Sequence, residues 1–132
     1  MTILLGVDIQ DIDEVCDSIE RFGNRYVERV YTSDEIDDCF RSPNRAAQKL
    51  AGRFAAKEAV LKVLKEGAAI VTWKEIEVRS LKSGQSVIEL RGFAAELATQ
   101  QGITTICLSI SHGGGYATAV VVAEKSMGSS DK

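Results

Sequence analysis

The sequence predicts an α+β fold, in which one strand and a block of helices precede an antiparallel sheet that one helix interrupts. Two observations lead to this class. Apolar residues recur with helical spacing between residues 12 and 64, and strand-like runs of β-branched residues dominate after residue 72. The 132 residues are enough for one core. We therefore assign residues 1–125 to a single domain and expect the polar tail 126–132 to be disordered.

The first half should contain a strand and three helices. TILLGVDIQ is a short, β-branched, apolar run and predicts a buried strand. DIDEVCDSIERFG predicts a helix that ends at Gly23. TSDE at residues 32–35 is typical of a capping box and should open a short helix that ends before Pro43. We expect Asn44 to cap a long helix that stops near Gly67.

The second half should be mostly strands. TWKEIEVRS and SVIELRG predict two strands joined by a turn at Ser83 and Gly84. The stretch FAAELATQQG predicts a short helix. TTICLSIS and YATAVVVAE predict a final hairpin, connected through HGGG.

Composition narrows the class of protein. A net charge of −3 argues against a nucleic-acid-binding protein, which usually carries a basic face. No segment resembles a signal peptide, and no apolar run reaches the roughly 18 residues that a membrane span needs. The three cysteines show no metal-binding spacing, which indicates reduced packing residues. We expect a cytoplasmic protein that binds neither membrane nor nucleic acid.

Two acidic residues stand where burial would be costly. Asp8 lies within the first predicted strand, and Glu58 lies with Lys62 on a long helix that is apolar almost all round. The two carboxylates could share a Mg²⁺ ion, with Lys62 directed at phosphates on the same ion. Alternatively, Glu58 and Lys62 form an ordinary surface pair at i and i+4, and Asp8 caps the next helix.

Other candidates lie on the same helix and in the last hairpin. His112, the only histidine, precedes three glycines and is either a turn residue or a phosphate contact beside a glycine-rich loop. Arg45, Lys49 and Arg53 recur every fourth residue, which describes either a solvated stripe or a phosphate-binding one.

Three motifs taken together resemble a known family. GVDIQDI, GRFAAKEAVLKVL and LSISHGGGYATAVVVAE occur in this order, and the similarity extends from about residue 3 to residue 124. They resemble the holo-acyl-carrier-protein synthases, the small bacterial group of 4′-phosphopantetheinyl transferases. The resemblance implies transfer of the 4′-phosphopantetheine group of coenzyme A to a serine of an apo acyl carrier protein, with release of adenosine 3′,5′-bisphosphate.

The resemblance also implies residue roles and an assembly. Asp8 and Glu58 match the Mg²⁺ ligands of the family, with Mn²⁺ as an alternative ion, and Lys62 matches its pyrophosphate-binding lysine. Homotrimers with shared active sites are implied, with Tyr116–Val122 packed at the trimer centre. By analogy, further residues would contact coenzyme A: Arg53, His112, Arg45 and Ser111.

The sequence departs from the family in two places. Many relatives carry basic residues early in the first helix, where Asp13 and Glu14 stand here and would repel an acidic carrier. Arg21, Arg25 and Arg29 could supply a basic rim instead, and a specialised carrier, for example from a polyketide pathway, is one hypothesis. KEGAAIVTW also lacks the Gly-Thr-Gly turn of many relatives, which bears on contacts to the adenine.

Two other functions compete with the transferase. One is a carrier-binding module of the same fold that does not catalyse, although such a module needs no Asp8, Glu58 or Lys62. The other is an enzyme that hydrolyses a nucleotide pyrophosphate such as coenzyme A without any carrier.

Overall fold

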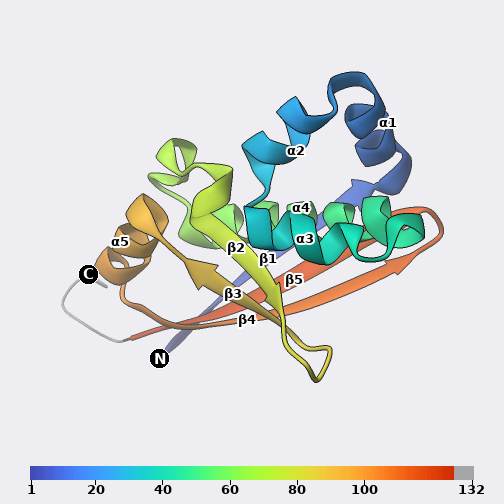
Figure 1. Ribbon diagram of the computed structural model, residues 1–132. Helices are drawn as coiled ribbons and strands as arrows, with labels where there is room; N and C mark the ends of the chain where they lie inside the picture. Colours follow the sequence, from blue (N-terminus) through green and yellow to red (C-terminus); the bar gives the residue numbers. More distant parts are fainter. Residues whose placement is uncertain (127–132) are drawn as a thin grey trace.

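The computed structural model describes residues 1–126 (Figure 1). Except for residue 126, the tail predicted to be disordered lies outside the described residues. Among residues 1–126, the five strands and five α-helices occur largely in separate blocks, with four helices between the first strand and the later ones, so the predicted α+β class is confirmed. Within residues 1–126, no helix is both long and apolar enough to cross a membrane.

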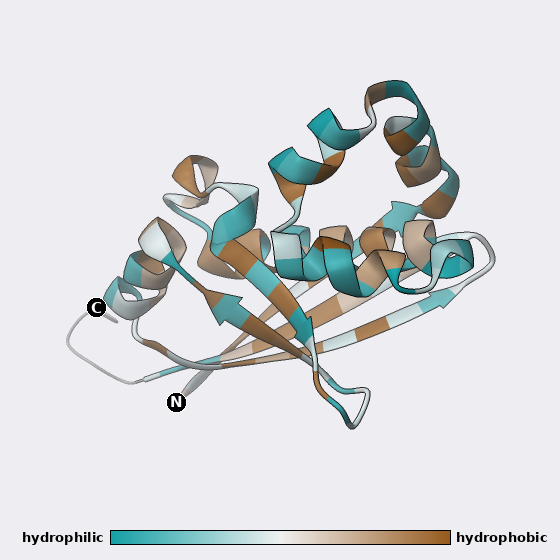
Figure 2. Ribbon diagram, in the orientation of Figure 1, coloured by the Kyte–Doolittle hydropathy of each residue, from teal (hydrophilic) through white to brown (hydrophobic). Residues whose placement is uncertain are grey.

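Two antiparallel sheets replace the single expected one. The first strand pairs with the final hairpin, giving the order β1-β5-β4, and the middle hairpin β2-β3 forms a sheet of its own. The strands are β1 (Thr2–Asp11), β2 (Ile76–Ser80), β3 (Ser86–Leu90), β4 (Ile103–Gly113) and β5 (Tyr116–Lys125). Hydrophobic and hydrophilic residues alternate along β2, as a half-buried strand requires (Figure 2).

The long helix α4 (Ala46–Leu64) lies on the three-stranded sheet and forms the centre of the core. Its small residues allow a close approach. A Cβ added to Gly6 of β1 would lie 2.1 Å from the carbonyl oxygen of Ala59, so only glycine fits at that position. This contact fixes the height of β1 against α4, and therefore the position of Asp8 two residues later.

The ends of α4 differ from the prediction. Asn44 does not cap the helix, because residues 43–45 form a 3₁₀ turn and Arg45 occupies the N-cap without a side-chain hydrogen bond. At the other end the helix stops at Leu64, three residues before Gly67. Lys65 follows with a φ of 54°, a conformation in which glycine is usual.

The helical block contains one helix that sequence reasoning missed. α1 (Ile12–Phe22) ends at Gly23 as predicted, and α3 (Ser33–Phe40) opens with the predicted capping box of Thr32 and Glu35. Between them lies α2 (Asn24–Val30), whose seven residues are too few to show a clear helical period. Residues 92–100 form α5 (Gly92–Gln100), the predicted interrupting helix.

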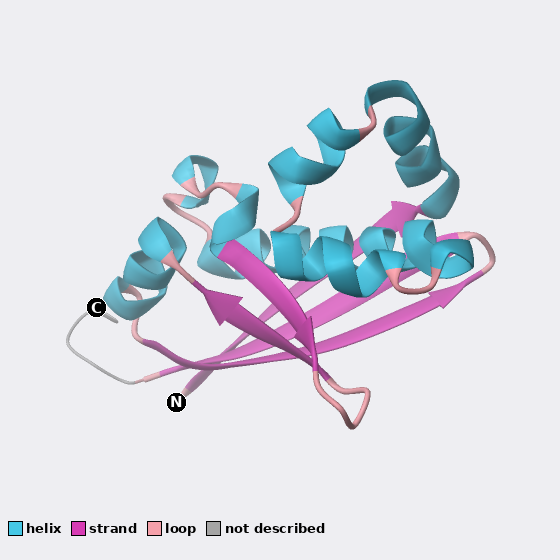
Figure 3. Cartoon of the chain, viewed as in Figure 1, coloured by secondary structure: helices cyan, strands magenta, loops and turns pink. Residues whose placement is uncertain are grey.

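In a single protomer the first strand is covered on one face only, so the prediction of a buried strand was wrong for the other face. Among residues 1–126 the helices lie on one side of the long strands (Figure 3). The opposite face of β1 exposes a row of apolar side chains, each 52–64% accessible: Ile3, Leu5, Val7 and Ile9. β5 adds Val120 to the same face. A single protomer therefore leaves an apolar sheet face uncovered, which is unusual for a monomeric protein.

Candidate active site

Asp8 lies on the face of β1 that is turned toward α4, and its carboxylate has two partners. The Gln10 amide donates to Oδ2 over 2.7 Å, and Lys62 Nζ lies 3.3 Å from Oδ1. Lys62 also donates to the carbonyl oxygen of Val7 over 2.6 Å. The Lys62 side chain is 53% accessible, so its ammonium remains open to a ligand.

Glu58 lies one turn before Lys62 on α4 and close to Asp8. Partial burial raises the pKa of the Glu58 carboxyl, and the negative charge of Asp8 raises it further, while Lys62 opposes both effects. The effect of Asp8 on Glu58 indicates that these carboxylates, 50 residues apart in the chain, lie near each other. One ammonium serves both of them, so the cluster of three side chains has a net negative charge.

The donor set at this place suits a hard divalent cation. Two carboxylates that repel each other are stabilised by a cation between them, and Mg²⁺ is commonly held by one or two carboxylates with the remaining positions left to water and phosphate oxygens. Among residues 1–126 no group of three or more His, Cys, Asp or Glu side chains is placed to hold a metal ion, so the chain would supply no more than two such ligands here. A site of this kind would therefore leave coordination positions free for a substrate.

The other predicted ligand-binding residues meet at a second place. A pocket of about 270 Å³ is lined by Arg45 at the N-cap of α4, by Lys49 and Arg53 of α4, and by His112 of β4. His112 Nε2 lies 2.9 Å from the amide nitrogen of Gln48. The basic residues of α4 therefore line a concave surface, which favours the phosphate-binding interpretation over a solvated stripe.

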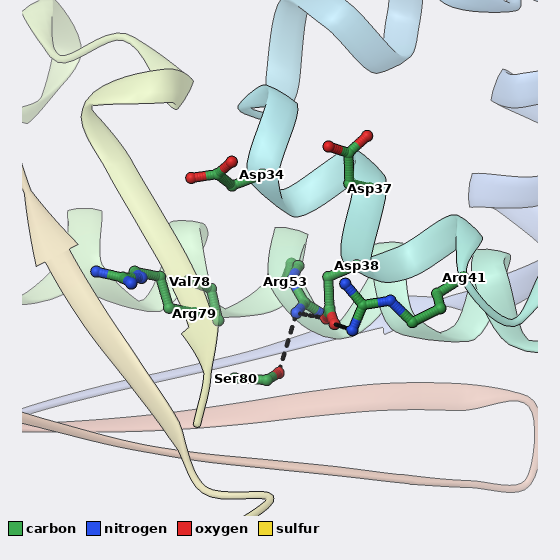
Figure 4. A pocket seen from close by; sticks show the side chains of 8 residues that line it. All are labelled: Asp34, Asp37, Asp38, Arg41, Arg53, Val78, Arg79 and Ser80. Atoms are coloured by element: carbon green, nitrogen blue, oxygen red, sulfur yellow. Dashed lines mark hydrogen bonds and ion pairs between the residues drawn. The ribbon is translucent and has the colours of Figure 1, made fainter. Parts of the chain in front are cut away.

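Arg53 is the most buried cation of this pocket. Its guanidinium is 6% accessible and is paired through Nη2 with the carboxylate of Asp38 and, over 3.1 Å, with the hydroxyl of Ser80 (Figure 4). Its Nε is buried and has no hydrogen-bond partner among the described residues. An unpaired buried donor of this kind is costly, and none of the described residues satisfies it.

Ser111 does not join this group within the protomer. It is the neighbour of His112 on β4, and successive side chains of a strand point to opposite faces. His112 faces α4 through its contact with Gln48, so Ser111 lies on the uncovered face of the sheet.

The two clusters lie over opposite edges of the sheet. Lys62 contacts β1, whereas Gln48 contacts β4, and β5 separates those strands. Glu58 and Arg53 are five positions apart on one helix, which places their side chains about 140° apart around its axis. One small ligand cannot reach both clusters of the same protomer, because α4 lies between them.

The predicted carrier-docking residues lie on the outer helices. Arg21 is on α1 and covers the ring of Phe22, with its guanidinium carbon 5.5 Å from the ring centroid. Arg25 and Arg29 of α2 line an adjoining hollow with Phe22 and Tyr26. Asp13 and Glu14 are in the first turn of α1, where the Asp11 side chain caps both of their backbone amides. Asp13 and Glu14 therefore lie at the opposite end of α1 from Gly23.

Sequence reasoning missed the charged residue that is most deeply buried on α4. Lys57 is completely inaccessible and donates to the carboxylate of Glu35 over 2.8 Å and to the carbonyl oxygens of Trp73 and Ile76. Burial lowers the pKa of Lys57, and Glu35 opposes that effect. The clue was the position of Lys57, directly before Glu58 among buried alanines. This ion pair ties α3 and β2 to α4 and so fixes the rotation of the helix that presents Glu58.

Comparisons with known proteins agree with this geometry. The 4′-phosphopantetheinyl transferase superfamily matches residues 4–121. The holo-acyl-carrier-protein synthase of Halothermothrix orenii is 39% identical over 121 residues, which cover 92% of this chain and 96% of the relative. That of Solibacter usitatus is 38% identical over 125 residues, which cover 94% and 99%.

Solved structures show the same fold. The complex of ACPS with CoA from Chronobacterium ammoniagenes superimposes with a TM-score of 0.83 at 30% identity, covering 96% of this chain and all of the other. The synthase of Helicobacter pylori in complex with coenzyme A gives 0.79 at 29% identity, covering 92% and 100%. The chain belongs to the 4′-phosphopantetheinyl transferase superfamily, and the family resemblance read from its motifs is confirmed.

Proposed function

We propose that this chain transfers the 4′-phosphopantetheine group of coenzyme A to a serine hydroxyl of an apo acyl carrier protein. The serine oxygen attacks the β-phosphorus of coenzyme A, the bond to the bridging pyrophosphate oxygen breaks, and adenosine 3′,5′-bisphosphate leaves. The observation that carries this proposal is the convergence of Asp8, Glu58 and Lys62, because a binding module of the same fold would need none of them.

Asp8 and Glu58 would hold Mg²⁺, or Mn²⁺ in its place. When bound, the ion would neutralise charge on the pyrophosphate and hold it for in-line attack. Gln10 fixes the orientation of the Asp8 carboxylate through its hydrogen bond. Lys62, held at 3.3 Å from Asp8, would turn its exposed ammonium toward the phosphate oxygens and stabilise the departing bisphosphate.

The serine proton has to leave as the new P–O bond forms. Glu58 is the candidate base within the chain, since its raised pKa makes its carboxylate more basic than an ordinary glutamate. A bound water is the second route for this proton.

A homotrimer would complete the active site. The uncovered face contains β1 and the Tyr116–Val122 segment, and an apolar face of this size favours burial against further copies. If the β1 edge of one copy meets the β4 edge of the next, Asp8, Glu58 and Lys62 would act together with the neighbour's basic pocket. Coenzyme A would then bind with its pyrophosphate on one copy and its 3′-phosphate near Arg53, Arg45 and His112 on the other. Ser111, on the uncovered face, would lie at the boundary between copies.

The carrier would dock on the outer surface of α1 and α2. Arg21 and Arg25 offer positive charge beside the exposed ring of Phe22, a combination that suits an acidic helix with an apolar stripe. Asp13 and Glu14 stand nearer the start of α1 and would disfavour a strongly acidic partner there. This balance favours a specialised carrier. The free thiols of the three cysteines suit a reducing compartment, for which we propose the cytoplasm.

One incubation tests the function. The protein is mixed with coenzyme A, Mg²⁺ and a panel of apo carriers from fatty-acid and specialised pathways, and intact mass is measured. Transfer adds one phosphopantetheine group to the preferred carrier, and Glu58→Gln loses it while remaining folded. Full activity of Glu58→Gln would refute the role of this carboxylate, and consumption of coenzyme A without any carrier would indicate a hydrolase instead.

A further inference from the structure

Asp38 of α3 forms an ion pair with Arg53, the most buried cation of the pocket that contains His112. Asp38 itself lies outside that pocket. Arg53 forms a wall between two hollows. One is the pocket lined by Arg45, Lys49 and His112, and the other lies between α3 and β2. Asp38 lines only the second hollow and reaches Arg53 from that side (Figure 4).

The pairing leaves Arg53 with little net charge to offer a ligand. The Asp38 carboxylate is 25% accessible, and Oδ2 contacts Nη2 of Arg53 directly. Its other oxygen, Oδ1, lies 3.6 Å from Arg41, but the Arg41 side chain is 75% accessible and weakly constrained. The remaining charged neighbours in this hollow are Asp34, Asp37 and Arg79, all exposed. Within residues 1–126, Asp38 is thus the only carboxylate that forms an ion pair with Arg53.

We propose that Asp38 is a positioning residue that orients Arg53 and weakens its grip on the 3′-phosphate of the coenzyme. This inference rests on the proposed function, since it takes Arg53 to be a phosphate ligand. Asp38 and Ser80 both hold Nη2, which fixes the orientation of the guanidinium at the wall of the pocket. The geometry of the donor is fixed, and the negative charge behind it reduces its attraction for phosphate.

Weak binding of the 3′-phosphate affects the rate of product release. Coenzyme A and the product adenosine 3′,5′-bisphosphate carry the same 3′-phosphate, so Arg53 binds substrate and product alike. Uniform binding of this kind lowers KM without lowering the barrier of the chemical step, and it slows release of the product. Asp38 therefore lowers the affinity for the coenzyme and speeds the release of the bisphosphate.

Calorimetric titration with adenosine 3′,5′-bisphosphate and Mg²⁺ tests this role. Asp38→Asn keeps a hydrogen-bond acceptor for Arg53 but removes the charge, so Kd for the bisphosphate should fall by about threefold to tenfold. Kd for adenosine 5′-monophosphate, which lacks the 3′-phosphate, should stay the same. Asp37→Asn is the matched control, because it removes an exposed carboxylate from the same helix and the same hollow without a contact to Arg53. It should change neither Kd.

Two further variants separate charge from damage. Asp38→Ser also removes the charge, so it should lower Kd for the bisphosphate as well. It replaces Asp38→Asn in the test if that variant folds poorly. In an Arg53→Gln background, Asp38→Asn should have no effect on Kd, because its influence passes through Arg53. Unchanged or weaker bisphosphate binding in both Asp38 variants would overturn the inference while leaving the proposed function intact. Absence of bisphosphate binding by the unmodified protein would overturn the inference, whereas the proposed function is decided separately by the carrier incubation.

Discussion

Lys62 Nζ lies 3.3 Å from the Asp8 carboxylate and 2.6 Å from the carbonyl oxygen of Val7, so a side chain of α4 ties down the edge strand β1. The same ammonium lowers the pKa of Glu58, which burial and Asp8 raise. Without a bound cation, Lys62 is the only positive charge that these two carboxylates are found to share within residues 1–126. The electrostatic conflict that remains leads to a prediction about pH.

Glu58→Gln should stabilise the metal-free protein at pH 7. The folded-state pKa of Glu58 lies above its ordinary value of 4.5, so ionised Glu58 opposes folding. This penalty is complete above the folded-state pKa and is absent well below 4.5, where both states are protonated. Because Glu58 is only partly buried, we expect a Tm increase of about 1–2 °C at pH 7 and none near pH 3.

The measurement is thermal unfolding in a chelating buffer at both pH values, with the exposed Glu96→Gln of α5 as control. Addition of Mg²⁺ should reverse the order of the two Tm values. The ion stabilises the folded unmodified protein by mass action, whereas the variant lacks one of its ligands. Equal Tm gains from Mg²⁺ in both proteins would speak against a metal site at Glu58.

The sequence identified individual residues of this site better than it predicted their arrangement in space. Asp8, Glu58 and Lys62 could be singled out because charge within apolar runs is conspicuous. Their separation from Arg53 and His112 could not, because it depends on β5 lying between β1 and β4. Lys57 escaped notice because a helical period alone does not tell a buried cation from an exposed one. The open face of β1 was missed for a related reason, since an apolar run looks the same whether a helix or another subunit covers it.

Lys57→Met should cost about 3–5 kcal/mol of unfolding free energy. The substitution leaves the Glu35 carboxylate buried without its cation, although Glu35 keeps hydrogen bonds from the backbone amides of Thr32 and Val78. Lys62→Met, on the same helix, removes an ion pair whose ammonium is half exposed and should cost less than about 1 kcal/mol. Urea unfolding measures both. Adding Glu35→Gln to Lys57→Met should recover part of the loss, and a further loss instead would contradict the pairing.

Gly6→Ala should destabilise the fold by about 3 kcal/mol and weaken the response to Mg²⁺. The new methyl group would meet the Ala59 carbonyl oxygen at 2.1 Å, and backbone atoms have to move apart to relieve the clash. That movement shifts Asp8 away from Glu58. Gly113→Ala, which meets nothing within 4 Å, is the control and should behave like the unmodified protein in urea unfolding and in Mg²⁺-dependent Tm shifts.

Thiol alkylation should distinguish the three cysteines and report on assembly. Burial raises the pKa of Cys39 to about 11, so this thiol should resist iodoacetamide at pH 8 in the native protein. Cys16 is exposed on α1 and should react. Cys107 is exposed in the protomer but pairs in register with Val122, which pairs with Leu5 of the open face. Peptide mass mapping at high and low protein concentration should show Cys107 protected only when copies associate. Equal labelling of Cys107 under both conditions would place the interface elsewhere.

Mixing two variants that are each impaired at a coenzyme A concentration below KM should restore activity if each active site is shared between copies. Glu58→Gln damages the cluster at β1, and Arg53→Gln damages the pocket at β4. In a trimer assembled at random from equal amounts, about a quarter of the sites combine an intact β1 cluster with an intact neighbouring pocket. When the two variants are unfolded and refolded together, the mixture should therefore modify the carrier at about a quarter of the rate of the protein without substitutions, as measured by intact mass. Separate refolding followed by brief mixing is the control and should give little. If co-refolding gives no more activity than this control, the two clusters do not work across a subunit boundary, and the shared-site arrangement has to be abandoned.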